Sequence, residues 1–195
     1  MSNNNSPEDF PNFLNNPVET VAERLLGCFF ERNLGGRRML ARIVETEAYD
    51  EGDAASHSHR GRTARTEVMF GEAGYLYVYF TYGMHYCCNV VTGEAGHGSA
   101  VLIRAVEPVE GIDSMEERRG LHGRNLTNGP AKLCQALDID LRLGGHDLRE
   151  EPLRLLTGEL LPGESSTCTT RIGISKATEL LRRHYIAGNP WVSRH

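Results

Sequence analysis

Five of the chain's seven tyrosines lie in one stretch, Tyr75-Leu-Tyr-Val-Tyr-Phe-Thr-Tyr-Gly-Met-His-Tyr86, which Gly83 interrupts near its middle. Aromatic and β-branched residues on both sides of a glycine are typical of two strands joined by a tight turn. Tyr82 stands beside that glycine, although turns favour Gly, Asn, Asp, Ser and Pro. The stretch therefore predicts a β-hairpin whose tip carries an exposed ring, and a ring in that place is available to contact another molecule.

The segments around this hairpin mix strand and helix patterns without the regular alternation of βαβ units. Strands are expected at 28–30, 39–48, 100–106, 153–156, 170–174 and 185–186, and helices at 17–27, 111–119 and 178–183. A further short helix is expected within 128–137, where a Gly-Pro turn opens it. Asn16 is expected to be the N-cap of the first helix and Pro17 its first residue. Residues 50–66 are rich in Gly, Asp, Ser, His and Arg, and predict a long ordered loop of the kind that carries function.

The fold class expected from these elements is α+β. A single domain over residues 17–195 would have an antiparallel sheet as its core, short helices around it and the tyrosine hairpin protruding from it. Residues 1–16, which are polar and rich in asparagine, would precede this domain as a flexible tail.

The composition of the 195-residue chain is that of an ordinary globular protein, with 39% hydrophobic and 24% charged residues. No apolar run approaches the roughly 20 residues of a membrane-spanning helix, and the N-terminus has no signal-peptide pattern. Five cysteines without CxxC spacing predict reduced thiols in the cytoplasm, or at the nucleoid of a bacterium. The net charge of −5 argues against a wholly basic surface, but arginines in short clusters leave a local basic face open.

Glu45, Glu47 and Tyr49 alternate along an expected strand, so their side chains share one face. Two glutamates on a strand most often mark a solvated edge, but the apolar residues just before them indicate a strand that enters the core. A glutamate at the end of such a strand can serve as a general base. His57 and His59 in the following loop could instead act as metal ligands, although their spacing matches no standard zinc signature.

The first strand of the hairpin alternates between two faces, which are Tyr75, Tyr77 and Tyr79 on one side and Leu76, Val78 and Phe80 on the other. The apolar face is expected in the core. The tyrosine face could be half-buried sheet packing with solvated hydroxyls. Together with Tyr82 and nearby arginines, it could instead stack on the unpaired bases of a nucleic acid.

A series of short motifs runs in order along almost the whole chain, from Pro17 to Ser193. They are Arg42-Ile-Val-Glu-Thr-Glu-Ala-Tyr49, His57 with Arg60-Gly61, Met69-Phe70, Leu76-Tyr-Val-Tyr79, Tyr82-Gly-Met84, Cys87, Asn89, Leu102-Ile-Arg-Ala-Val-Glu-Pro108, Asn128-Gly-Pro-Ala-Lys-Leu-Cys134 and Asn189-Pro-Trp-Val-Ser193. In this order they resemble the alkyladenine DNA glycosylases, also called 3-methyladenine or N-methylpurine DNA glycosylases. His59 and Cys88 match no role in that family, and none is assigned to them.

The resemblance implies a monofunctional DNA glycosylase of base excision repair. Such an enzyme flips alkylated or deaminated purines out of duplex DNA and hydrolyses the N-glycosidic bond, which leaves an abasic site. Glu47 would be the general base that activates the water, and Arg104 would help to hold that water. Methylated purines, hypoxanthine and etheno-adducts all fit what the family acts on.

The resemblance also implies how the base is held. The residues around the extruded base would be Tyr49, His57 and Tyr79. Asn89 would exclude the exocyclic amino group of guanine, and Tyr82 would fill the gap left in the duplex. The other tyrosines of the hairpin, Tyr75, Tyr77 and Tyr86, would then serve in sheet packing.

Neither lysine of the chain, Lys132 or Lys176, belongs to the motifs of the expected pocket. Because a lyase reaction would need a Schiff-base lysine, the expected product is an abasic site in an uncut strand. Lys132 and Gly129 are expected to contact the DNA backbone, through an ammonium and through N–H groups. The scheme needs no metal and no cofactor, and its partner is double-stranded DNA with damaged purines, bound by a monomer away from any membrane.

Two other functions stay open from the residues alone. The chain could be a metal-dependent hydrolase that uses Glu45, Glu47, His57 and His59 as ligands. It could also be a non-catalytic protein that binds single-stranded nucleic acid through the tyrosine face.

Overall fold

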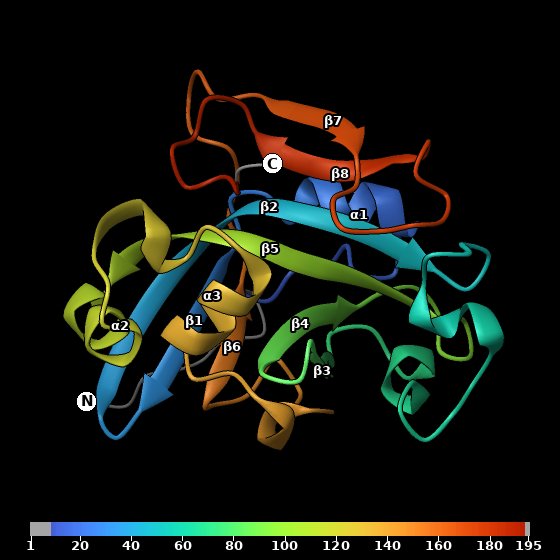
Figure 1. Cartoon of the computed structure of the whole chain (residues 1–195), viewed down its shortest axis with the longest axis horizontal. Helices are drawn as coiled ribbons and strands as arrows, with labels where there is room; N and C mark the ends of the chain where they lie inside the picture. The colour runs from blue at the N-terminus through green and yellow to red at the C-terminus, as the bar shows by residue number, and fades with distance from the viewer. Residues whose placement is uncertain (1–8, 194–195) are drawn as a thin grey trace.

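The computed structural model describes residues 9–193, in which short helices pack around one antiparallel sheet (Figure 1). The strands are β1 Phe29–Leu34, β2 Arg37–Asp50, β3 Leu76–Thr81, β4 His85–Val91, β5 Ser99–Glu110, β6 Leu153–Leu156, β7 Ser166–Thr170 and β8 Leu181–Ile186. The α-helices are α1 Val18–Arg24, α2 Ile112–Arg119 and α3 Pro130–Ala136, and the 3-10 helices are η2 His57–Arg60, η3 Glu67–Phe70, η4 Gly123–Leu126 and η5 Leu141–Leu143. This arrangement confirms the predicted α+β class with an antiparallel sheet.

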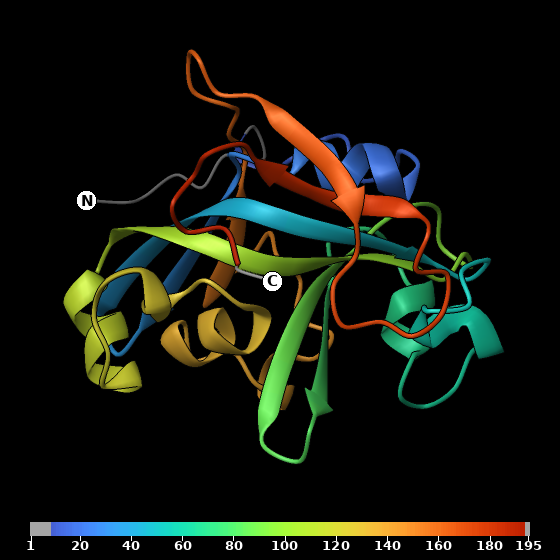
Figure 2. The ribbon, with the colours of Figure 1, turned by 45° about the horizontal axis from the view of Figure 1, so that its top comes forward.

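The sheet is organised around the two long strands β2 and β5. Its order is β3-β4-β5-β2-β1-β6, and β8 adds to β2 while β7 pairs only with β8. The first half of β2 pairs with β1, and its second half, from Glu45 to Glu47, pairs with β8. The β3–β4 hairpin projects from the body of the protein, on the side where the loop after β7 also approaches (Figure 2). The second half of β2 therefore lies in the middle of the sheet, with a strand on each side.

A register shift occurs in the middle of the β2–β5 pair. Val44 has no partner on β5 and Arg104 has none on β2, on either side of the pair formed by Glu45 and Ala105. On β2, Met39, Ala41 and Ile43 lie in the main core before the shift, and Ala48 lies there after it. On β5, Val101 and Ile103 lie in the main core on one side of the shift, and Val106 lies there on the other. In both strands, odd-numbered side chains face the main core on one side of the shift and even-numbered side chains face it on the other. This change of face places Glu45, Glu47 and Arg104 on the side of the sheet away from the main core.

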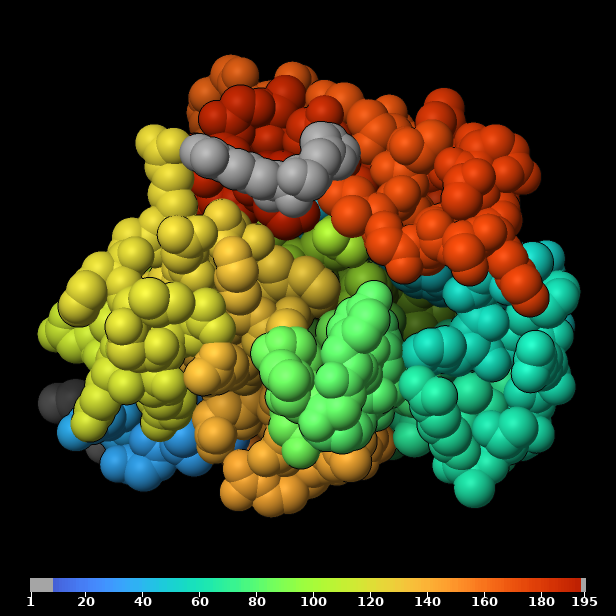
Figure 3. Space-filling model, viewed as in Figure 1, coloured from blue at the N-terminus to red at the C-terminus, as the bar shows by residue number. Residues whose placement is uncertain are grey.

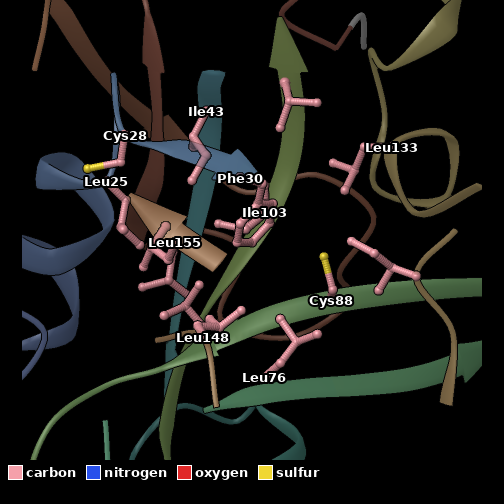
Figure 4. Close-up of a cluster of buried hydrophobic side chains, with 14 of the residues drawn as sticks. Leu25, Cys28, Phe30, Ile43, Leu76, Cys88, Ile103, Leu133, Leu148 and Leu155 are labelled. Atoms are coloured by element: carbon pink, nitrogen blue, oxygen red, sulfur yellow. The ribbon is translucent and has the colours of Figure 1, made fainter. Parts of the chain in front are cut away.

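The main core is formed by apolar side chains from all parts of the sheet and from the helices. Figure 4 shows the labelled side chains meeting between the strands and α3, among them Phe30, Ile43, Ile103 and Leu133. Two smaller apolar clusters lie elsewhere, one beneath the tyrosine face of β3 and one where β2 and β5 meet β8. None of the helices within residues 9–193 is long and apolar enough to cross a membrane.

The N-terminal part of the chain differs from the expected tail. Residues 9–16 pack onto the domain, and Phe13 and Leu14 are buried in the main core, which explains why two large apolar residues stand in an otherwise polar stretch. Residues 1–8 of the expected tail lie outside the described residues. The predicted cap of α1 is wrong, because Pro17 occupies the cap position and no side chain caps the helix.

The C-terminal elements also differ from those expected. The strand predicted over 170–174 is found earlier, as β7, and the helix predicted over 178–183 is wrong because Leu181–Arg183 begin β8. Pairing with β7 and, from Arg183 on, with β2 satisfies the backbone of these residues and overrides their local helical pattern. The core position expected for Phe80 is wrong as well, since 45% of its surface is exposed near the end of the hairpin.

Candidate active site

The tip of the β3–β4 hairpin presents a tyrosine to solvent. Tyr82 has a φ of 51°, which is uncommon for a residue with a Cβ, and 83% of its surface is exposed. Gly83 follows with a φ of 70°, and the Met84 N–H donates to the Thr81 carbonyl to close the turn. Backbone strain at an exposed ring is a feature that points toward function rather than stability.

A cavity of about 530 Å³ opens beside this hairpin. Its walls come from β3, β4, β5, the loop that holds η2, the end of β2, Pro130 and the segment 172–176. Figure 3 shows a hollow between the hairpin, the loop that follows β2 and the segment that follows β7. The residues predicted for the site that line this cavity are Tyr49, His57, Tyr79, Tyr82, Asn89 and Arg104. Parts of the chain that are far apart in sequence therefore meet at one hollow.

Glu47 lies directly behind the cavity wall and has no exposed surface. Its Oε2 accepts the Tyr49 hydroxyl at 2.7 Å, and its Oε1 accepts the backbone N–H of Ile172 at 2.8 Å. The Nη1 of Arg104 lies 3.2 Å from Oε1. Burial raises the pKa of the Glu47 carboxyl above its ordinary value, while Arg104 opposes the rise. A carboxylate with a raised pKa accepts a proton from water more readily than a solvated one.

Glu45 is also fully buried, but its surroundings differ from those of Glu47. Its Oε1 accepts Arg104 Nε at 3.1 Å and Arg183 Nε at 2.7 Å. Both oxygens also accept bonds from Ser193, from the N–H at 2.7 Å and from the hydroxyl at 2.8 Å. Glu45 is thus held by two guanidinium groups, and Arg104 joins it to Glu47.

Aromatic rings from three elements form the sides of the cavity. The His57 Nδ1 is hydrogen-bonded to the Tyr77 hydroxyl at 3.0 Å, and the His57 ring meets Tyr79 edge-on at a centroid distance of 4.6 Å. Burial lowers the pKa of His57, and the charge of Arg65 lowers it further, so this imidazole is neutral at pH 7. Tyr77 also lines the cavity, although its expected place was sheet packing. Its position two residues before Tyr79, on the same strand face, was the signal that could have revealed it.

Two polar side chains of β4 complete the floor of the cavity. The Asn89 Nδ2 donates to the Tyr77 carbonyl at 3.1 Å, which fixes the orientation of its amide. Cys87 lies beside it, and burial raises the pKa of this thiol to about 11, so it is uncharged at neutral pH. Asn89 lines the cavity, where the sequence predicts it. Cys87 belongs to the motifs of the resemblance, but no role was predicted for it.

A buried ion pair supports Tyr49. Arg171 and Asp53 have no exposed side-chain surface, and the Arg171 Nη2 donates to the Asp53 Oδ1 at 3.1 Å. The Arg171 guanidinium carbon lies 4.6 Å from the centroid of the Tyr49 ring. These two residues were missed by sequence reasoning, because they are 118 positions apart and no local pattern joins them.

The residues expected at the DNA backbone lie next to the cavity rather than in it. Gly129 is buried just before α3, and the Lys132 Nζ donates to the Asn128 Oδ1 at 2.7 Å. The other lysine, Lys176, lines the cavity. Lys176 belongs to none of the motifs of the expected pocket, and its place at the cavity was missed by sequence reasoning.

The four residues of the metal-site alternative do not come together. Glu45 and Glu47 are engaged by arginines, His57 is bonded to Tyr77, and the His59 Nδ1 is 3.1 Å from the Glu51 carbonyl oxygen. Among residues 9–193, no group of three or more His, Cys, Asp or Glu side chains is placed to hold a metal ion. The described part of the chain thus offers no ligand set for that alternative.

Comparisons with known proteins agree with the motifs. A family model described as Methylpurine-DNA glycosylase (MPG) matches residues 12–190. A protein of Carboxydothermus hydrogenoformans is 51% identical over 179 residues, which cover 91% of this chain and 94% of that protein. A protein of Methanoculleus marisnigri is 49% identical over 191 residues, covering 93% and 96%. One of Chlorobaculum tepidum is 46% identical over 185 residues, covering 93% and 88%. All three are named "Putative 3-methyladenine DNA glycosylase". By its sequence the chain belongs to the methylpurine-DNA glycosylase family.

Proposed function

We propose that this chain flips alkylated or deaminated purines out of duplex DNA and hydrolyses the N-glycosidic bond with a water activated by Glu47. The observation that carries the proposal is a buried glutamate, held by Arg104 and Tyr49, behind a cavity with aromatic walls. A carboxylate in that place cannot reach a base that is stacked in a duplex, so the nucleotide must rotate out to meet it. The cavity volume of about 530 Å³ lies in the range of sites that enclose a small ligand.

The chemistry proposed for Glu47 is general-base catalysis. The carboxylate takes a proton from water as the sugar carbon develops oxocarbenium character, and the same negative charge stabilises that carbon. Arg104 favours the ionised form of the buried carboxyl and helps to hold the water. The Tyr49 hydroxyl occupies Oε2 at 2.7 Å, so in this mechanism water takes its place at Oε2 when a base enters the cavity.

Recognition of the base is assigned to the residues that line the cavity. Tyr49, His57 and Tyr79 stack around the purine, and electron-rich rings suit a purine that is electron-poor or cationic. Asn89, whose amide is fixed by the Tyr77 carbonyl, excludes the amino group of guanine. Tyr82 enters the duplex in place of the extruded nucleotide, which recovers part of the lost stacking.

The proposed partner is double-stranded DNA with damaged purines, bound by a monomer. Gly129 and Lys132 contact its phosphates. Lys176 is exposed, whereas a Schiff-base lysine is activated by desolvation in an apolar pocket. The proposed product is therefore an abasic site in an intact strand, even though this lysine lines the cavity.

The test is base release from a panel of duplex oligonucleotides. Each duplex carries one hypoxanthine, one etheno-adenine or one 7-methylguanine, with undamaged duplex as the control. We expect free base from at least one damaged duplex, none from undamaged DNA, and strand cleavage only after alkali. Treatment with borohydride during the reaction should trap no protein on DNA. Failure to release any damaged base would refute the activity, and a trapped complex that disappears in Lys176→Ala would refute the monofunctional product.

A further inference from the structure

Glu45 is a fully buried carboxylate that the proposed reaction leaves unused. Its two oxygens accept four hydrogen bonds, from Arg104, Arg183 and twice from Ser193. These donors come from β5, from β8 and from the segment after β8, so three separate parts of the fold converge on one side chain. Most fully buried charges need such partners, because desolvation of a lone carboxylate is costly.

Among these donors, Arg104 is also ion-paired with Glu47. Its Nε lies 3.1 Å from the Glu45 Oε1, and its Nη1 lies 3.2 Å from the Glu47 Oε1. Arg183 supplies Glu45 with a second guanidinium at 2.7 Å. The Arg104 guanidinium thus contacts two carboxylates. How strongly Glu45 attracts it depends on the other donors to Glu45, which are Arg183 and Ser193.

We propose that Glu45 is a positioning residue for the reaction: with Arg183 and Ser193, it sets how much of the Arg104 charge is available to Glu47. This role rests on the proposed function of Glu47 as the general base. Glu45 itself does not line the cavity. It acts by fixing the Arg104 guanidinium and by placing a second negative charge two strand positions from Glu47.

The direction of each substitution follows from the charges around Glu47. Those that face it are Arg104 on β5, Glu45 and the Tyr49 hydroxyl on β2, and Arg183, which is the strand partner of Glu47 on β8. Arg171 lies beyond the Tyr49 ring, and the Ile172 N–H after β7 also faces Glu47. If Glu45 loses its charge, Arg104 serves Glu47 alone, and the ionised form of Glu47 is favoured. If Glu45 instead loses Arg183 or Ser193, it draws more strongly on Arg104, and the ionised form of Glu47 is disfavoured.

The experiment measures single-turnover base release against pH on duplex DNA that carries 7-methylguanine. This base is already cationic, so its departure needs no acid, and the acid limb of the profile reports the general base alone. In Glu45→Gln the limb should move to lower pH by about one to two units, from two charges about 7 Å apart at an effective dielectric of about 20. In Arg183→Gln it should move to higher pH by about one unit.

Two further variants keep the test decisive. Ser193→Ala is a small change that removes one donor from Glu45, and it should move the limb in the same direction as Arg183→Gln by about half a unit. Glu31→Gln is the matched control, because Glu31 is also a buried strand glutamate bonded to two arginines, Arg38 and Arg154, but on β1. It should leave the limb unchanged. A loss of stability alone would lower the rates without moving the limb in opposite directions.

The outcomes separate this role from the proposed function. If Glu47→Gln releases base at the parental rate, Glu47 is not the base, and both proposals fall. If Glu47→Gln is inactive but Glu45→Gln and Ser193→Ala keep the parental limb, only the role of Glu45 is refuted. Shifts of opposite sign in those two variants would support it, and shifts of the same sign would overturn it.

Discussion

Glu47 and Tyr82 lie at opposite extremes of the same site: one has no exposed surface, and the other exposes 83% of it. Glu47 is held by hydrogen bonds from Tyr49 and Ile172 and by an ion pair with Arg104, whereas the backbone around Tyr82 is closed by a single turn hydrogen bond. A group that moves protons needs fixed geometry. A ring that enters a duplex needs only to be exposed and presented. We therefore expect the interior to control the chemistry and the tip to control access to the base.

The sharpest way to break this comparison is Glu47→Gln. Base release from damaged duplex should fall by about 10²–10⁴-fold, the usual contribution of a general base, while binding to the same duplex persists. Both are measured on one oligonucleotide, by release under single turnover and by titration. A variant that loses binding in step with release would place Glu47 in DNA recognition instead of in the chemistry.

The same substitution should make the protein more stable at neutral pH. Because the pKa of Glu47 is raised in the folded protein, the stability that its protonated carboxyl contributes is present below the unfolded pKa of 4.5. That stability is lost as the pH rises through the folded pKa. The uncharged amide of the variant has no such loss of stability, so its Tm at pH 7 should be higher, by about 2–4 °C for each kcal/mol of stability gained. Parent and variant should converge at pH 4. Thermal unfolding at the two pH values measures this, and a lower Tm at pH 7 would contradict it.

A smaller effect is expected from Tyr82→Ser. Loss of one stacking contact costs about 1–3 kcal/mol, so the rate of base release from duplex DNA should fall by about 5–150-fold. On single-stranded DNA with the same lesion the rates should be equal, because no gap has to be filled. Leu161→Ser removes an exposed apolar side chain outside the cavity lining and is the control. Equal losses on both substrates would mean that the tip takes part in the chemistry.

The smallest effect is expected from Lys132→Ala. Loss of one phosphate contact should weaken binding for all sequences alike and reduce the slope of log K against log salt by about 0.9. Arg37→Ala serves as the control, since this exposed arginine is already paired with Glu117 at 2.9 Å. Titrations at several salt concentrations give both slopes. An unchanged slope in Lys132→Ala would exclude this lysine from the DNA contact.

The elements with strong local patterns could be predicted from the sequence. The tyrosine hairpin, the glutamate strand and the helix after Asn128 are found where the patterns indicate, because alternation and turn residues act over a few positions. The end of β8 was predicted as a strand, but its first residues, Leu181–Arg183, were mistaken for a helix, since they become a strand only through pairing with the distant segments β7 and β2. In the site, the predicted cavity residues do meet, but Arg171, Asp53 and Lys176 were missed. Their places depend on contacts between distant segments, which a local pattern does not encode.

The register shift at Glu45 makes the chemistry depend on counting residues as well as on their identity. Because strand side chains alternate, one residue more or fewer between Ile43 and Glu45 would turn Glu47 and Tyr49 toward the core and bring Thr46 and Ala48 to the cavity. The register of β2 with β5 therefore decides which of its side chains reach the cavity. Substitutions in the first half of β2 that keep its length leave this register unchanged, whereas we expect a single deletion there to turn Glu47 and Tyr49 away from the site.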